Sequence, residues 1–256
     1  MRTSLLAARK DLIILFRSPL AYILMACYLF IAGYFFASGV GYLQLVSIQL
    51  MQMPQTAGGF SPQELVVGPF LQNAGVILLF FLPMLTMRGF SEEKRMGTFE
   101  LLMSYPLSEA TLVGGKLLSL ALFLAVMLLF SALGPALLYF FVAPETAPLL
   151  AGYLGLFLMA VSFGSLGLFL STLTENQVVS AVLSFASLLV LWLLAWIKDI
   201  VPAALQPLVE GLSLLSHFEP FTKGVLAVAD LTYYLAFTAA FFWLSVLSLE
   251  NQRWRA

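Results

Sequence analysis

Six long stretches without a charged residue dominate this sequence, and each is about long enough to cross a lipid bilayer. A transmembrane helix needs roughly 20 apolar residues, because each residue advances the helix by about 1.5 Å. The stretches are continuously apolar and lack the two-residue alternation of barrel strands, so they predict helices. The predicted spans are Pro19–Gly39, Pro69–Met87, Leu117–Val142, Leu149–Ser171, Val178–Ile197 and Leu231–Leu249.

The composition excludes a water-soluble globule. Hydrophobic residues make up 61% of the 256 residues and charged residues only 10%, with a mean hydropathy of +0.99. A soluble domain carries about 25% charged residues, because its surface faces water. The single cysteine, Cys27, allows neither a disulfide framework nor a cysteine-based metal site. The sequence therefore predicts an all-α integral membrane protein with one transmembrane domain, residues 1–256.

The basic residues predict how the chain is oriented. With six spans both termini share a side, which holds ten of the 12 Lys and Arg residues, whereas the opposite side holds only Lys198 and Lys223. Basic residues concentrate in cytoplasmic loops, so we expect a multi-pass protein of the cell (inner) membrane with both termini in the cytoplasm. The apolar run after Arg17 is long for a signal peptide and lacks a clear cleavage site, which predicts an uncleaved first span.

The predicted spans contain no Asp, Glu, Lys, Arg or His near their middle. Proton-coupled and sodium-coupled transporters place such residues there, so this class is disfavoured. An intramembrane hydrolase is an alternative, with Ser165 as nucleophile and His217 as base. Close helix packing is the simpler explanation for Ser165, because Gly164 and Gly167 lie beside it. The sequence therefore predicts no catalytic residue, no cofactor-binding residue and no metal ligand.

The connection between the second and third spans is the most informative segment. Residues 88–100 hold six charged side chains in a chain that has few. Ser91 is placed to cap a short helix, and Gly97 is expected to end it. Thr98 can cap a second short helix, which Pro106 would stop. We expect an amphipathic segment on the cytoplasmic side.

The second short helix presents Phe99, Leu102 and Met103 on one face. This face can dock onto a partner protein, or it can rest on lipid headgroups. Acidic and basic residues alternate along the segment and do not form a basic patch, which favours the partner protein.

The same segment carries a family resemblance. Residues 87–102 (MRGFSEEKRMGTFELL), followed by 105–108 (YPLS) and Gly115-Lys116, resemble the coupling segment of type-two ABC permeases. They are especially similar to the membrane subunit of the gliding-motility-associated ABC transporters. Further similar segments are Arg9–Asp11, Arg17–Pro19 with Ala21 and Tyr22, Leu173–Val178, His217–Phe218, Lys223–Leu226 and Asp230–Leu231.

The resemblance implies six spans with three further elements. These are an N-terminal interfacial connecting helix, a cytoplasmic coupling helix between spans two and three, and short outer re-entrant helices before span six. Arg9, Lys10 and Arg17 would lie on the connecting helix. Their positions on a helical wheel fit an interfacial helix, but a plain membrane-anchoring flank fits equally well.

The resemblance also implies a function: the membrane-spanning (permease) subunit of an ATP-driven ABC exporter. The chain has no Gly-x-x-x-x-Gly-Lys-Ser/Thr motif, so ATP and Mg²⁺ would be bound by two copies of a separate ATPase subunit. A second permease subunit, identical or related, and the lipid bilayer would be further partners, with an auxiliary extracytoplasmic subunit left open and no nucleic acid expected. A membrane scaffold that anchors a cytoplasmic ATPase machine without transport is the alternative.

The resemblance places the ATPase contact on the coupling segment. Apolar residues of this segment would touch the ATPase, and charged residues would fix the register of the contact. The predicted coupling residues are Glu92, Glu93, Arg95, Gly97, Phe99, Glu100, Leu102 and Met103.

Overall fold

The computed structural model describes residues 2–52, 63–99, 107–138, 146–198 and 200–253. This part of the chain is helical and contains no β-strand, which confirms the predicted all-α fold. Six of its helices are long and apolar enough to cross a membrane. They are α2 (Pro19–Gln52), α3 (Gly68–Thr86), α6 (Glu109–Ser131), α8 (Thr146–Leu173), α9 (Gln177–Ile197) and α12 (Val228–Arg253).

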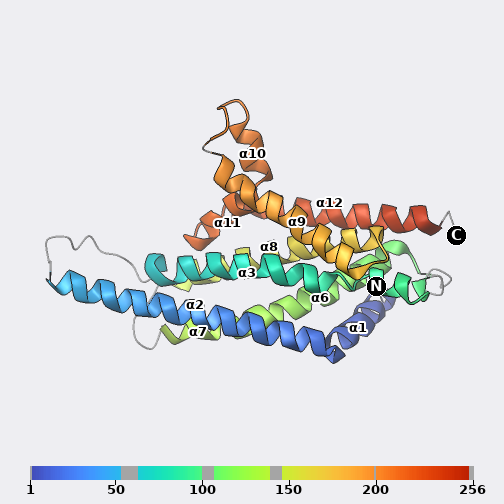
Figure 1. Ribbon diagram of the computed structural model, residues 1–256, viewed down its shortest axis with the longest axis horizontal. Coiled ribbons are helices and arrows are strands. Elements are labelled where there is room, and N and C mark those ends of the chain that lie inside the picture. The colour runs from blue at the N-terminus through green and yellow to red at the C-terminus, as the bar shows by residue number, and fades with distance from the viewer. Residues whose placement is uncertain (1, 53–62, 100–106, 139–145, 199, 254–256) are drawn as a thin grey trace.

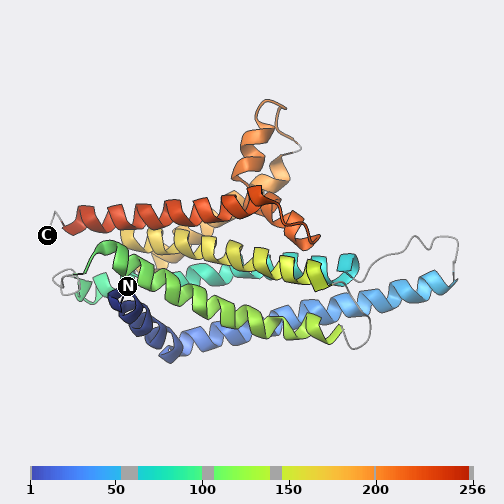
Figure 2. The same ribbon diagram turned by 180° about the vertical axis from the view of Figure 1, so that it is seen from behind.

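The long helices run roughly along one axis of the molecule, with both chain ends at the same end of the bundle (Figures 1 and 2). This arrangement agrees with an even number of spans. The first long helix is longer than predicted, because α2 continues past Gly39 to Gln52. At about 1.5 Å per residue its 34 residues are longer than the roughly 30 Å thickness of a hydrocarbon core.

Shorter helices precede the first span or lie between the spans. They are α1 (Arg2–Arg17), the π-helix η2 (Gln63–Val67), α4 (Ser91–Arg95), α7 (Leu133–Leu137), α10 (Gln206–Leu212) and α11 (Leu214–Thr222). The chain bends sharply at Ser18, between α1 and α2 (Figure 1). Pro19 has no N–H for α1 to continue, whereas it suits the first position of α2. The helix α1 thus occupies the place predicted for the connecting helix.

Two short helices lie in the segment before the last span, where short helices were predicted. The helix α10 projects away from the bundle, whereas α11 lies against it (Figure 1). Leu214, Phe218 and Phe221 of α11 are fully buried, which explains why this segment is too apolar for a free loop. The two helices fit the predicted positions, and re-entry into the outer leaflet stays a prediction.

The helix α8 is the centre of the bundle, in contact with α3, α6, α9, α11 and α12. Its small residues allow this close approach. A Cβ atom at Gly164 would overlap the Leu120 side chain of α6, and one at Gly167 would overlap the Thr86 side chain of α3. The small residues around Ser165 therefore serve helix packing, as small residues do in other membrane bundles.

Gly167→Ala should lower the free energy of unfolding of the purified protein in detergent by about 1–3 kcal/mol, because the added methyl group overlaps Thr86. The unfolding temperature should fall accordingly. Gly33→Ala is the matched control: Gly33 also lies in a long helix, and a methyl group added there would meet no atom within 4 Å. That variant should be neutral or slightly stabilising, since alanine favours helix. Equal effects of the two changes would contradict the packing role.

Candidate functional site

The helix α4 is one turn of helix at the end of the bundle that holds both chain ends (Figure 1). Ser91 does not cap it, contrary to the sequence prediction: Phe90 occupies the N-cap position and makes no capping side-chain bond. The Ser91 hydroxyl instead donates to the Ser171 carbonyl oxygen at 3.1 Å. The Ser91 hydroxyl, which the local sequence predicts as the helix cap, is therefore bonded to the backbone of a different helix.

Gly97 ends α4, as predicted. Its φ of +68° lies in the left-handed region that favours glycine. The N–H of Gly97 donates to the carbonyl of Lys94 at 3.1 Å, and the N–H of Thr98 donates to the carbonyl of Glu93 at 3.0 Å. These two bonds form the Schellman arrangement that commonly closes a helix.

The carboxyl end of α8 is held by side chains from α4 and α12. Ser91 donates to the carbonyl of Ser171, and the Lys94 ammonium donates to the carbonyl of Thr172. Gln252 of α12 donates to the same Thr172 carbonyl at 2.9 Å. The last carbonyls of a helix have no partner within the helix, and a cation there also suits the helix dipole. This end of α8 therefore fixes α4 to the bundle.

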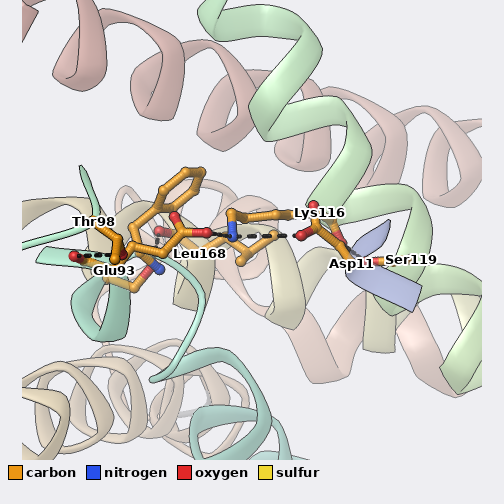
Figure 3. A network of polar contacts seen from close by, with 8 residues as sticks. Asp11, Glu93, Thr98, Lys116, Ser119 and Leu168 are labelled. Carbon is orange, nitrogen blue, oxygen red and sulfur yellow. Dashed lines mark hydrogen bonds and ion pairs between the residues drawn. The ribbon is translucent and has the colours of Figure 1, made fainter. Parts of the chain in front are cut away.

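Lys116 of α6 joins α4 to α1 through ion pairs (Figure 3). Its ammonium lies 2.8 Å from Oε1 of Glu93 in α4 and 3.9 Å from Oδ1 of Asp11 in α1. All three side chains are largely shielded from solvent, with exposed fractions of 11–18%. The ammonium also lies 4.9 Å from the ring centre of the fully buried Phe90, within cation–π range. We call Asp11, Glu93 and Lys116 the Lys116 network.

The two carboxylates of the Lys116 network are not equivalent. Burial raises the pKa of Asp11 above its ordinary value, although the nearby Lys116 opposes this shift. Asp11 is also the more distant partner of Lys116. Glu93 is therefore the principal counter-ion of the lysine.

A second set of contacts joins α4 to the end of α12. Phe90, Val113, Val246 and Leu249 form a small buried cluster, and the half-buried Phe99 packs against it. Close by, the Arg253 guanidinium of α12 lies 2.7 Å from Glu109 at the start of α6. The predicted partner-facing residue Phe99 thus has an apolar environment within this chain.

The structure distributes the other predicted coupling residues over two faces of α4. Glu92 lines a cavity beside the Lys116 network, and Glu93 belongs to that network, whereas Arg95 and Gly97 are exposed. The predicted residues Glu100, Leu102 and Met103 lie outside the described residues, as does the rest of the second short helix.

The predicted connecting-helix residues Arg9, Lys10 and Arg17 all lie in α1. Lys10 and Arg17 are exposed, and Arg17 also lines the cavity beside the Lys116 network. Both positions suit an interfacial helix, whose basic side chains reach water and headgroups.

Sequence reasoning did not assign Asp11, Lys116, Ser171, Thr172 or Gln252 to the site. Only Lys116 carried a signal of its own, as a lone cation in the first turns of an otherwise apolar span. The hydroxyl and amide residues have no distinctive pattern, and they matter because the fold brings their backbone or side chains to α4 and α12.

The structure does not join the two residues of the alternative hydrolase site. The Ser165 hydroxyl donates to the Ser162 carbonyl oxygen at 2.8 Å. His217 lies 2.7 Å from Asp230 and stacks on the Tyr233 ring with centres 3.9 Å apart. Neither residue is hydrogen-bonded to the other, so the geometry offers no nucleophile–base pair from them.

A double-mutant cycle measures the contact between Glu93 and Lys116. Glu93→Gln should destabilise the protein in detergent, because a shielded ammonium loses its nearest carboxylate. Glu93→Gln combined with Lys116→Met should cost less than the sum of the two single changes, with a coupling free energy of about 1 kcal/mol or more.

Asp11→Asn with Lys116→Met is the matched control cycle. Its coupling should be smaller, because the Asp11 oxygen is farther from the ammonium and burial already disfavours the aspartate charge. A larger coupling for Asp11 than for Glu93 would refute the assignment of the principal counter-ion.

Comparison with known proteins extends over almost the whole chain. Residues 5–252 match the family model described as ABC-2 family transporter protein. No curated protein gave a significant match.

Proposed function

Because the chain belongs to the ABC-2 family of transporter proteins, and is thus a membrane subunit of an ABC transporter, we propose that it is the permease of an ATP-driven exporter. It forms the translocation path and couples to a separate ATPase subunit, which binds ATP and Mg²⁺. Two ATPase copies and a second permease, identical or related, complete the complex in the cell inner membrane. Within the family, the sequence similarity favours the gliding-motility-associated group.

The position of α4 is the observation that carries the coupling proposal. Its bundle face is fixed by Ser91, Glu93 and Lys94, whereas Arg95 and the turn that follows are exposed. Met96 in this turn has an exposed fraction of 62%. A partner that binds the exposed turn therefore acts on an element already attached to the spans.

Through its contacts, α4 would transmit the effect of a bound partner to three helices, α6, α1 and α8. Glu93 reaches α6 through Lys116, and Lys116 reaches α1 through Asp11. Lys94 reaches the end of α8, the central helix of the bundle. Movement of α4 by the ATPase would then shift these helices together and switch the bundle between two packings.

We divide the predicted coupling residues between two roles in this proposal. Phe99 packs against Phe90 and its neighbours, so we assign it to the joint between α4 and the bundle. Arg95 and the Gly97 turn are assigned to the ATPase contact, together with Leu102 and Met103, the other apolar residues predicted for the second short helix.

Gly97→Val tests the coupling proposal, because a β-branched residue is strained at a φ of +68° by about 1–3 kcal/mol. In co-purification from mild detergent, the wild-type chain should retain an ATPase chain with a nucleotide-binding motif. Gly97→Val should retain several-fold less, and Gly97→Asn should retain nearly as much as wild type, since asparagine tolerates this conformation.

Two results would count against the proposal. One is full transport activity of the isolated chain with no nucleotidase bound. The other is an ATPase that co-purifies but whose hydrolysis is unrelated to any transported compound, which would favour the scaffold alternative.

The proposed orientation, with both termini in the cytoplasm, predicts which introduced cysteines react with a membrane-impermeant thiol reagent in intact cells. In a Cys27→Ser background, Leu208→Cys in α10 should react from outside, and Met96→Cys should react only after permeabilisation. The two positions are matched, because each has an exposed fraction of 62%. Labelling of Met96→Cys in intact cells would place the α4 end outside and reject the proposed contact with a cytoplasmic ATPase.

A further inference from the structure

A half-open cavity of about 390 Å³ lies at the bend between α1 and α2. Its walls come from these two helices, the end of α3, α4, α6 and α8. The bend is the point where α1 ends and the first span begins (Figure 1). The cavity therefore lies at the depth where lipid headgroups meet the ends of the spans.

One wall of the cavity carries charges of both signs. Asp11 and Lys116 are paired there within the Lys116 network. Arg17, Arg88 and Glu92 also line the wall, and none of them forms an ion pair with another described residue. The Nε of Arg88 is buried and has no hydrogen-bond partner among the described residues. Two guanidinium groups without an ion-pair partner among the described residues thus line this wall, and guanidinium groups pair with anions, so the site favours an anionic ligand.

The remaining wall is apolar and continues onto the outside of the bundle. Ile14, Leu20 and Leu85 line the cavity. Ile14 is 55% exposed, and Tyr22 and Ile23 on the adjoining turn of α2 are 50% and 60% exposed. An aliphatic chain can thus lie along this surface while a polar group occupies the charged wall.

We propose that this cavity binds the headgroup phosphate of a membrane phospholipid, with Arg17 and Arg88 as its ligands. Guanidinium groups bind phosphate oxygens through paired, charge-assisted hydrogen bonds. The carboxylates of Asp11 and Glu92 in the same wall repel a ligand with several negative charges. A headgroup with a single phosphate diester therefore fits better than a phosphomonoester or a polyphosphate.

The experiment is lipid binding to the full-length protein in detergent, measured by native mass spectrometry. Dioleoylphosphatidylglycerol and dioleoylglycerol are the probes, because they share acyl chains and differ in the phosphate group. Wild type should bind the phospholipid, and Arg88→Gln and Arg17→Gln should each weaken binding about tenfold, the effect of losing one charge-assisted contact. Arg95→Gln is the control, since Arg95 is exposed and does not line the cavity.

Three results would overturn the proposal. Dioleoylglycerol could bind as tightly as the phospholipid, or neither arginine variant could differ from Arg95→Gln. Inorganic phosphate could also displace the phospholipid at equal concentration, which would identify a site for free phosphate. Arg17 is exposed, so Arg17→Gln tests the proposal even if Arg88→Gln fails to fold.

Discussion

The free carbonyls at the end of α8 are the constraint on which the polar end of the molecule depends. A helix leaves its last carbonyls without internal partners, and in a membrane protein these must be satisfied near the interface. Here Ser91 and Lys94 of α4 and Gln252 of α12 supply the donors. Because α8 is also the central helix of the bundle, the short helix α4 becomes attached to the element that most other described helices contact.

The Lys116 network connects α4 to two further helices, α6 and α1. Lys116 stands at the start of an apolar span, where its charge can reach the interface. It contacts α4 through Glu93 and α1 through Asp11. Ion pairs that are shielded in this way keep most of their strength, because salt and water screen them less than exposed pairs. Three elements distant in sequence are therefore held in one arrangement at the end that would meet an ATPase.

The cavity follows from the same arrangement. The bend at Ser18 turns α1 away from the axis of α2 (Figure 2), and Asp11 and Lys116 of the Lys116 network line part of the space beside the bend. A ligand there would touch α1, α4 and α6 at once. The phospholipid proposal does not depend on the transport proposal, since its evidence is the unpaired charge and apolar wall of the cavity.

The sequence alone determined the number of long helices and the segment around Ser91–Gly97, but it misplaced the end of α2 and both ends of α6. These features depend on local chemistry: apolar length, the absence of charge, and a glycine that ends a helix. It did not determine that Ser91 donates to Ser171, that Phe99 packs within the chain, or that Lys116 joins Glu93 to Asp11. Only the tertiary structure decided these contacts, because their partners lie on other helices. Whether the Ser91 hydroxyl caps its own helix or donates to the Ser171 carbonyl depends on how α4 and α8 pack.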